Sequence, residues 1–583
     1  MARTSRPRAN SDAYREKFIA IGIDFGTTFS GVSWAFSEDP DNIHEISEWP
    51  GANHINQGEV QVTLNMMPVK WFKLLLLNDN DLVKEDVNLS KRLMQSRKEL
   101  SDHPSKMSAV NMVGRYLGKL WHHAQAILKT KLDIDGMSLR VAITVPAIWP
   151  HHAQRAMRKA ADLAGITARR PMGAPTLELI HEPEAASLSI MLERSLLPEI
   201  KLGQCFVVYD AAGGTVDVIS YQVISIQPFQ LKECVGGEGG LFGAVRIDEA
   251  FESYLWGRDR LKLNSLSPSE YNTLVVEDWE RGVKRTFTKQ EQPIQFSLRL
   301  PLKAYKTRDR WRNKDHFSFN RSEVQSFFNK SLTGIRALVS EQRRRVQTET
   351  GKLPKNILLV GGLGSSLHVY GVLNEVFDET VLRWSAVARG AVIRLLQDKL
   401  STQQTLSETR REVLATLPDV TARKSRYSYG ICLSYAIDEL RDYDASLDIA
   451  TRDLDGDLVA PRMVWYLKKG EEVSGKSPLT VPFWRYYKAP IPKKCILTIR
   501  YSPDDPPPKR PDPTVEELCT IECAFDTDFS KWEPVGYPDK GYRRCENLWL
   551  KLTFNGEPRW EFRVGSQQAT ADARVDYMEK DRR

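Results

Sequence analysis

One pattern occurs twice in this chain and constrains its fold more than any other feature. Residues 18–36 run from an apolar stretch into Asp24, pass through a Gly/Thr turn, and return as a second alternating stretch. Residues 206–221 repeat this order around Asp210. Each copy predicts a strand, a tight turn and a second strand. Two copies indicate an internal duplication.

Strands and helices alternate between and after the two copies. The expected elements are a strand at 139–146, a helix at 152–164, a helix beginning near 181, a helix opened by a capping box at 322–325, and a strand at 356–360. Such alternation is typical of an α/β fold.

The character of the chain changes after residue 397. The polar segment 398–424 predicts a linker helix, and residues 425–583 read as short strands and turns, which indicates a β-rich module. At the other end, residues 1–17 are basic and polar, and we expect a disordered tail.

Composition narrows the location and the partners. No apolar run reaches the length of a membrane helix, the N-terminus has no signal-peptide core, and the 7 Cys are scattered. These features favour a reduced, intracellular protein in the cytoplasm, with the nucleus as the alternative. Lys plus Arg, 82, against Asp plus Glu, 75, gives a net charge of +7. Over this length that charge is mild and does not indicate a nucleic-acid binder.

The two Gly/Thr turns suggest phosphate chemistry. Successive backbone N–H groups in such a turn form a nest for anions, and an Asp at the strand end can hold Mg²⁺ through water. Residues 361–366 form a third Gly-rich turn between a strand and a helix. Two turns that face each other would clamp a nucleoside triphosphate.

These motifs resemble a known family. Residues 23–30 are similar to the first phosphate motif of the heat-shock protein 70 chaperones, within the actin-like ATPase superfamily. The further matches are 145–147 with 154–155 (first connecting helix), 181–186 (the Asn-Glu-Pro-Thr-Ala-Ala segment), 210–217 (second phosphate motif), 359–362 (adenosine motif) and 386–391 (second connecting helix). They follow the family's order over residues 18–397.

The resemblance implies an architecture. It predicts a two-lobed actin-like ATPase fold of duplicated ribonuclease-H-like subdomains, with lobe I at 18–203, lobe II at 204–355, and a return to lobe I at 356–397. Details such as Trp71-Phe-Lys73 and residues 427–430 are similar to the divergent branch of long, atypical members common in filamentous fungi. The family's usual peptide-binding domain is not visible in the sequence.

The resemblance also implies roles for individual residues. Asp24, Glu182 and Asp217 match catalytic positions, and Asp24 and Asp217 would hold Mg²⁺ through water. The phosphate-binding positions are Gly26, Thr27, Thr28, Gly213, Gly214 and Thr215. Gly361 and Gly362 match the approach to the nucleoside, and Lys284 and Arg285 the basic pair beside adenine. The implied ligands are ATP or ADP with Mg²⁺.

Three departures from the family pattern bear on activity. Ala212 stands where the second phosphate motif has Gly, and Leu363 and Ser365 replace polar and Arg positions of the adenosine motif. The stretch from 50 to 71 is short and lacks the family's Lys-bearing turn, which helps hydrolysis; Lys70 and Lys73 lie nearby but do not fit that motif. The gap indicates a degenerate enzyme or an error in the gene model.

Three functions remain open at this point. The first is an ATP-binding, Hsp70-like protein with weak Mg²⁺-dependent ATPase activity, a chaperone-like role, and protein clients or co-chaperones as partners. The second is a nucleotide-binding switch or scaffold that does not hydrolyse ATP, and the third is a small-molecule kinase on the same superfold. Two other features of the sequence are interpreted as structural. The basic run 303–314 is predicted to be a solvated loop, and the C-terminal Trp residues 465, 484, 549 and 560 are predicted to lie in the core.

Overall fold

The chain divides into two compact units, Met1–Asp419 and Val420–Arg583, which we describe separately. The computed structural model describes residues 17–27, 30–49, 71–78, 81, 93, 96–98, 100–102, 107–192, 201–288, 295–306, 316–377, 380–383, 387–402, 419–453, 456–474, 478–488, 490, 494–524, 532–534, 541–554, 558–564 and 574–576. The tail expected at 1–16, Thr28, and the short stretch 50–70 therefore lie outside the described residues.

The first sheet of unit 1 carries the Asp24 hairpin. Its strand order is β3-β2-β1-β4-β5, with β1 antiparallel to β2 and parallel to β4. The strands are β1 (Phe18–Phe25), β2 (Ser30–Phe36), β3 (Asp39–Glu45), β4 (Ser138–Val145) and β5 (Thr176–His181). Strands β1, β2 and β4 are largely buried, as the long apolar runs in their sequences require, whereas β3 is mostly exposed and β5 is buried at Leu179 and Ile180.

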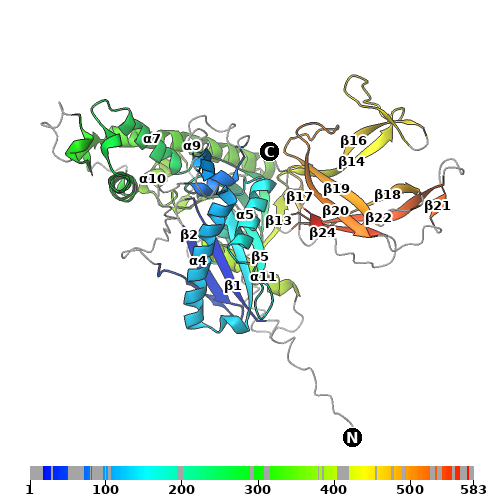
Figure 1. Cartoon of the computed structure of the whole chain (residues 1–583), viewed down its shortest axis with the longest axis horizontal. Coiled ribbons are helices and arrows are strands. Elements are labelled where there is room, and N and C mark those ends of the chain that lie inside the picture. The colour runs from blue at the N-terminus through cyan, green and yellow to red at the C-terminus, as the bar shows by residue number, and fades with distance from the viewer. Residues whose placement is uncertain are drawn as a thin grey trace, which may run out of the picture. The chain divides into compact units, whose positions relative to one another are not determined.

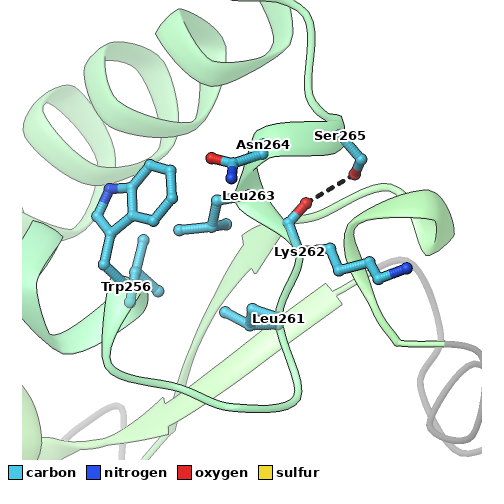
Figure 2. Close-up of a pocket in the computed structure, with 7 residues that line it drawn as sticks. Trp256, Leu261, Lys262, Leu263, Asn264 and Ser265 are labelled. Carbon is cyan, nitrogen blue, oxygen red and sulfur yellow. Dashed lines mark hydrogen bonds between the residues drawn. The ribbon is translucent and has the colours of Figure 1, made fainter.

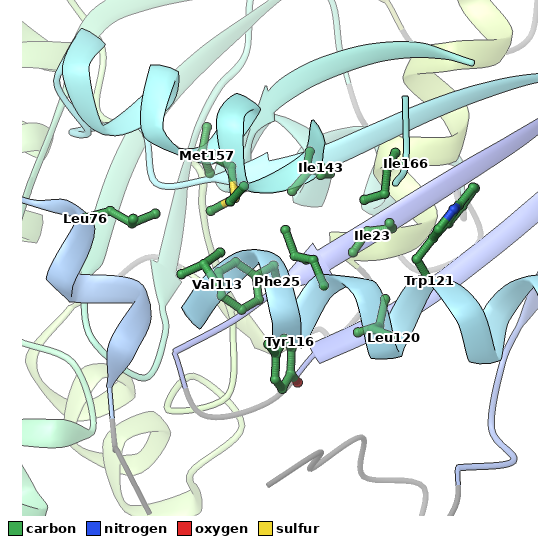
Figure 3. Packing of buried hydrophobic residues seen from close by; sticks show 14 of the residues in the cluster. Ile23, Phe25, Leu76, Val113, Tyr116, Leu120, Trp121, Ile143, Met157 and Ile166 are labelled. Atoms are coloured by element: carbon green, nitrogen blue, oxygen red, sulfur yellow. The ribbon is translucent and has the colours of Figure 1, made fainter. Parts of the chain in front are cut away.

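Helices cover both faces of this sheet. The β1 side chains Ile19, Ile21 and Ile23 share one core with α4 (Ala109–Lys131) and α5 (His151–Leu163), as Figure 3 shows for part of that core. On the opposite face, a Cβ on Gly22 would lie 2.3 Å from the carbonyl oxygen of Ala388 in α11 (Val387–Thr402). The glycine is required there because α11 approaches the strand backbone directly.

A second sheet carries the Asp210 hairpin. Within unit 1 its strands follow the order β12-β11-β6-β7-β8, with β6 antiparallel to β7 and parallel to β11. They are β6 (Cys205–Ala211), β7 (Val216–Ile226), β8 (Phe229–Gly240), β11 (Asn356–Val360) and β12 (Thr380–Arg383). The two sheets thus repeat one strand order, an antiparallel meander followed by two parallel strands. That repeat agrees with the duplication indicated by the paired Asp turns.

The helices that follow the second sheet pack around an aromatic core. They are α7 (Val245–Trp256), α8 (Pro268–Asn272), the π-helix η5 (Thr273–Lys284), α9 (Arg321–Thr350) and α10 (Leu367–Val376), whereas α6 (Glu182–Leu192) follows β5 and packs against α11. The rings of Phe251 and Trp279 stack with centroids 4.1 Å apart, and Phe327 meets both edge-on. Short elements complete unit 1: η1 (Phe72–Leu76), η2 (Ile134–Gly136), η4 (Leu263–Ser265), η6 (Leu302–Ala304), β9 (Gln295–Arg299) and β10 (His316–Asn320). Figure 1 shows α4 and α5 beside the strands of the first sheet.

The segment expected to be a linker helix is helical only at its start. Helix α11 continues to Thr402, residues 403–418 lie outside the described residues, and Asp419–Lys424 form strand β13. In β13 the side chains of Val420 and Ala422 are buried while Asp419 and Thr421 are only half-buried, which is the two-residue period of a strand. The prediction of a helix at 419–424 is therefore wrong. Burial of alternate side chains, rather than the polarity of the segment, determines its structure.

Unit 2 consists of strands wherever the structure describes a regular element. One sheet has the order β15-β16-β14-β19-β20-β24, and another has β18-β22-β21 with β23 also paired to β22. Their bounds are β14 (Ser428–Ala436), β15 (Thr451–Arg452), β16 (Leu458–Leu467), β18 (Leu479–Lys488), β19 (Lys494–Ser502), β20 (Glu516–Ala524), β21 (Glu533–Pro534), β22 (Tyr542–Phe554), β23 (Pro558–Val564) and β24 (Arg574–Asp576); β17 (Glu472–Val473) pairs with β13. Apolar side chains of both sheets form one core, as in a sandwich. Trp560 lies in this core, whereas Trp484 and Trp549 are 47% and 37% exposed, so the prediction that these two are core is wrong.

Candidate functional site

The Asp24 turn contributes a carboxylate whose negative charge is partly balanced by neighbouring groups. Asp24 lies at the end of β1, and its Oδ1 accepts a hydrogen bond from the Thr144 hydroxyl at 3.0 Å. Burial, together with the nearby Glu182 carboxylate, raises the pKa of Asp24 to about 6, although Lys73 and Thr144 oppose that rise. Gly26 and Thr27 follow in the turn and are half-buried.

The Asp210 turn contributes two carboxylates that face each other across a hairpin. Asp210 on β6 pairs in register with Asp217 on β7, and both side chains are buried. Asp217 Oδ1 accepts from the backbone N–H of Ile148 at 2.9 Å, whereas Asp217 Oδ2 and Asp210 Oδ1 have no hydrogen-bond partner among the described residues. Burial and the charge on Glu182 raise the pKa of Asp217 to about 7 and raise the pKa of Asp210 well above its usual value.

The two turns lie side by side. A Cβ on Gly214 would lie 2.8 Å from Thr27 Oγ1, so the second turn touches the first. Gly213 anchors the next helix, since its carbonyl accepts from the N–H of Val245 at 2.8 Å. Thr215 is buried directly before β7, and its hydrogen bond to Asp217 opposes the rise in the pKa of that carboxyl group. The residues expected to bind phosphate at both turns are thus neighbours in the fold.

The ammonium group of Lys73 lies among these carboxylates. Its Nζ is 2.5 Å from Glu182 Oε1 and also donates to the carbonyl of Phe25, the last residue of β1. Both members of this ion pair are almost completely buried. Lys73, which does not fit the family's Lys-bearing motif, thus lies beside Glu182 and the end of β1, while the stretch 50–70 lies outside the described residues.

The backbone around Lys73 is unusual. Trp71, at the start of η1, has φ 60°, the left-handed region that non-glycine residues rarely adopt. Such strain persists where surrounding contacts fix it, frequently at functional sites. Trp71 is buried, and Leu74 and Leu75 of the same short helix belong to the core beneath it. Lys73 could have been selected from the sequence because it is the single charged residue within the apolar run 71–77.

The third glycine turn lies against the second. Gly361 has φ 83°, and a Cβ there would lie 2.3 Å from Asp210 Oδ1 and 2.5 Å from the Ala211 carbonyl. Leu363 and Gly364 donate their N–H groups to that same carbonyl, at 2.8 and 3.0 Å. Gly362 is exposed at the tip. Only glycine fits position 361 in this arrangement.

The departure at Ala212 causes no backbone strain. Its N–H donates to the Thr215 carbonyl at 3.0 Å, and its own carbonyl accepts from Ala244 at 3.2 Å. Among the described residues, Trp71 is the non-glycine residue with positive φ, so Ala212 occupies a conformation open to any L residue. The added methyl group is therefore compatible with the turn.

The expected adenine pair has other contacts. Lys284 is buried, and both oxygens of Asp248 accept from its Nζ at 2.8 Å. Asp248 also accepts from the indole N–H of Trp279 at 2.8 Å, which ties η5 to α7. Arg285 is half-buried at the end of η5. The structure brings Lys284 to Asp248 rather than to the carboxylates of the turns.

One pocket in unit 1 is formed by none of the residues selected from the sequence. Figure 2 shows it beside the end of α7, where it has a volume of about 520 Å³ and is lined by Leu255, Trp256 and residues 261–265. Its lining is mainly apolar, and Ser265 turns away to donate to the Lys262 carbonyl at 2.7 Å.

The carboxylates of the site suit a hydrated cation better than a directly bound one. In the part of the chain that the structure describes, no three His, Cys, Asp or Glu side chains are arranged to hold a metal ion by themselves. Mg²⁺ uses one or two carboxylates and keeps most of its waters. The two unpartnered oxygens, on Asp210 and Asp217, fit such a hydrated ion.

Comparison with known proteins gives partial matches. The chain is 23% identical to the human "Heat shock 70 kDa protein 12A" over 381 aligned residues. This alignment covers 53% of this chain and 56% of that protein. It is 26% identical over 325 residues to the human "Heat shock 70 kDa protein 12B", covering 44% and 47%. It is 25% identical over 385 residues to a "Chaperone protein HscA homolog" of Acinetobacter baumannii, covering 64% and 56%. The chain thus spans about half the length of the curated relatives it matches.

Unit 2 has a match of its own. A family model described as "Domain of unknown function (DUF8568)" matches residues 423–528, which lie within this unit. No described helix in either unit is long and apolar enough to cross a membrane. The relatives' names support a likeness to Hsp70 proteins, and they leave the role of unit 2 open.

Proposed function

We propose that this protein binds ATP with Mg²⁺ at the three glycine turns and hydrolyses it slowly, as an Hsp70-like ATPase with a two-lobed actin-like fold. The observation that carries the proposal is the Lys73–Glu182 pair, buried beside the paired Asp turns. The buried ammonium lies among four carboxyl groups, and three of them have raised pKa values, so an added cation would stabilise their ionised forms. A metal-bound polyphosphate brings both that charge and an anion for the lysine.

In this proposal, different groups of the chain would bind phosphate, hold the metal ion and orient the attacking water. Backbone N–H groups of the turns at Gly26–Thr28 and Gly213–Thr215 would hold phosphate oxygens, and Gly361 and Gly362 would admit the nucleoside. Asp24 and Asp217 would hold Mg²⁺ through water, and that ion would supply charge that stabilises the phosphates. Glu182 would orient the attacking water, and Lys73 would stabilise the phosphate oxygens.

A switch or scaffold that binds nucleotide without hydrolysis is the second candidate. Residues matched to the adenosine end have other contacts: Leu363 is buried in the core, Ser365 donates to the Gly362 carbonyl at 2.7 Å, and Lys284 binds Asp248. These contacts favour altered nucleoside recognition. The burial of Lys73 beside Glu182 favours the enzyme, and we place it first.

The remaining parts of the proposal rest on the resemblance. They are a chaperone-like role with protein clients or co-chaperones, a cytoplasmic location, membership of the divergent branch, and a β-rich module at 425–583 in place of the usual peptide-binding domain. A small-molecule kinase is the least favoured reading, because the collinear segments 145–147 and 181–186 resemble the chaperones.

The test is ATP affinity and single-turnover hydrolysis on the full chain. We expect Glu182→Gln to bind Mg-ATP within about threefold of the parent and to slow hydrolysis by about 100-fold, since each 1.4 kcal/mol is tenfold in rate. Glu45→Gln, on the exposed side of β3, is the matched control and should change neither. Tight binding without hydrolysis in the parent would support the switch. Folded protein that gives neither heat nor a thermal shift with millimolar Mg-ATP would reject both candidates.

A further inference from the structure

The ammonium group of Lys73 has aromatic neighbours as well as charged ones. Its Nζ lies 5.4 Å from the ring centroid of Phe25 and 5.4 Å from that of Trp149. A ring face attracts a cation within about 6 Å of its centroid, and Trp is the strongest of the aromatic partners. All three side chains are buried, so water screens this attraction little. Two rings thus hold the ammonium in addition to Glu182 and the Phe25 carbonyl.

Both rings have supports of their own. The Phe25 ring lies against those of Phe72 and Tyr116, with centroids 6.0 and 5.5 Å apart, and Figure 3 shows Phe25 beside Tyr116 in the core. Trp149 follows β4, and its carbonyl accepts from the side-chain amide of Gln154 in α5 at 3.0 Å. Because these contacts fix the two rings, the rings can fix the ammonium between the elements that carry them.

The loop that carries Trp149 also reaches the second Asp hairpin. Ile148, the residue before it, donates its N–H to Asp217 Oδ1 at 2.9 Å. Two consecutive residues therefore contact the ammonium beside the first hairpin and a carboxyl group of the second. The position of one charged group relative to the other depends on this loop between β4 and α5.

Aromatic rings hold an ammonium in a way that another carboxylate could not. The lysine side chain is a flexible four-carbon stem, and rings restrict it without supplying a countercharge. The ammonium has three N–H donors. The Phe25 carbonyl and Glu182 accept from two of them, and no other acceptor for Lys73 is present among the described residues. The third donor therefore remains available to an anion.

We propose that Trp149 is a positioning residue of the ATPase: its ring, with that of Phe25, holds the Lys73 ammonium where it stabilises the phosphate oxygens. This role rests on the proposed function, and it belongs to a residue that the family resemblance did not select. A reacting group displaced by about 1 Å can cost a hundredfold in rate. Loss of the ring should therefore slow the chemistry more than it weakens binding, which depends mainly on backbone N–H groups.

The first experiment compares Trp149→Leu and Trp149→Phe with the parent, on the full chain, for Mg-ATP affinity and single-turnover rate. We expect Trp149→Leu to hydrolyse at least about tenfold more slowly, with an affinity within about threefold of the parent. Trp149→Phe keeps a ring and should recover most of the rate. If Trp149→Leu matches the parent, or Trp149→Phe is as slow as Trp149→Leu, the positioning role is overturned and the proposed function stands.

The matched control is Trp121→Leu. Trp121 is buried in the same core as Trp149, and Figure 3 shows it across that core from Leu76, the residue of η1 that is drawn. Its loss should lower stability, as any large-to-small change in a core does, and should leave the single-turnover rate of the parent. An equal loss of rate in Trp121→Leu would assign the effect to general packing and overturn the role of Trp149.

The second experiment needs no nucleotide. A double-mutant cycle of Lys73→Met and Trp149→Leu, measured by urea unfolding, gives the coupling between the two side chains. We expect at least about a tenfold coupling in the unfolding equilibrium constant, as for a desolvated cation–π contact, and less than about twofold for Lys73→Met with Trp121→Leu. Additive effects at Lys73 and Trp149 would overturn the inference. Coupling in a parent that neither binds nor hydrolyses Mg-ATP would instead refute the proposed function, and with it the role of Trp149 in chemistry.

Discussion

The two Asp hairpins of unit 1 share a frame and differ in charge. In the first, Gly31 on β2 stands opposite Asp24; in the second, Asp217 on β7 stands opposite Asp210. The first hairpin also receives the Lys73 ammonium at the carbonyl of Phe25, whereas the second has two carboxylate oxygens without partners among the described residues. One copy of the duplicated frame therefore binds a cation of the chain itself, and the other copy has two buried carboxyl groups whose raised pKa values show that their ionised forms are disfavoured.

The comparison teaches how a repeated fold acquires an asymmetric site. Strand order and the register of the paired strands are the same in the two copies, so neither determines the chemistry. The difference lies in one register position, Gly31 against Asp217, and in one side chain delivered by η1. Substitutions at these positions should remove or sharpen the asymmetry.

The largest effect is expected from Lys73→Met. Removing the ammonium leaves Glu182 buried without its partner, and loss of one member of a buried pair costs about 3–5 kcal/mol of stability. Urea unfolding without nucleotide measures this loss. Adding Glu182→Gln to the same chain should recover part of it, because the two residues are coupled.

A surface pair provides the control for Lys73. Lys17 and Glu38 lie 3.0 Å apart with Lys17 about half exposed. Lys17→Met should cost less than about 1 kcal/mol, as exposed pairs do. Equal losses for the two lysine variants would contradict the assignment of a buried charge centre around Lys73.

A smaller effect of opposite sign is expected from Asp217→Asn. The folded pKa of Asp217, about 7, lies above its ordinary value of 3.8, so the ionised form is disfavoured by folding. Above pH 7 the charge therefore lowers stability, and the neutral amide should raise the free energy of unfolding by roughly 2–4 kcal/mol at pH 8. Asp24→Asn should gain less, because the pKa of Asp24 rises only to about 6.

The same variants connect stability with the proposed ligand. Asp217→Asn should lose most of the thermal stabilisation that Mg-ATP gives the parent, so that the apo protein gains stability while binding weakens. A variant that is less stable than the parent at pH 8, in the absence of Mg²⁺, would show that Asp217 is not repelled by its neighbours.

The smallest effect concerns acid stability near the first sheet. Burial, with the Arg155 charge next in importance, lowers the pKa of His151 at the start of α5 to about 3 from its ordinary 6.5. The unfolded chain therefore binds the proton first, and stability present above pH 6.5 is lost as the pH falls toward 3. At pH 5 the loss should be about 2 kcal/mol.

The variant His151→Gln should flatten that slope between pH 7.5 and 5 in urea unfolding. His122 on the exposed side of α4 is the control, and His122→Gln should keep the slope of the parent. A parent whose stability does not change over this range would contradict a neutral, buried His151.

Local sequence patterns predicted the two hairpins, but they did not predict contacts between residues that are far apart in the chain. The strand ends at Asp24 and Asp210 follow from runs of apolar residues and small turn residues, which are neighbours in the chain. Lys73 could not be assigned this way, because its partner Glu182 lies more than a hundred residues later and only the fold brings them together. Whether the residues at these turns bind nucleotide stays a prediction.

Competing local signals explain a smaller error. The sequence predicts a capping box at 322–325. In the structure the box lies two residues earlier: Asn320 Oδ1 accepts from the N–H of Glu323 at 2.9 Å, and Glu323 Oε2 accepts from the N–H of Asn320 at 2.8 Å. Strand β10 ends at Asn320, so the sheet rather than the cap selects where α9 begins.

The contact of α11 with β1 has a consequence for synthesis of the chain. The strand that leaves the ribosome first is closed by a helix made after residue 387, against which Gly22 packs. At 5–20 residues per second, roughly 20–70 s separate the two during translation. For that interval one face of β1 lacks its final partner, and we expect the exposed apolar surface to make the nascent chain prone to aggregation. Because α11 is synthesised late, β1 reaches its full stability only after residues 387–402 have been made.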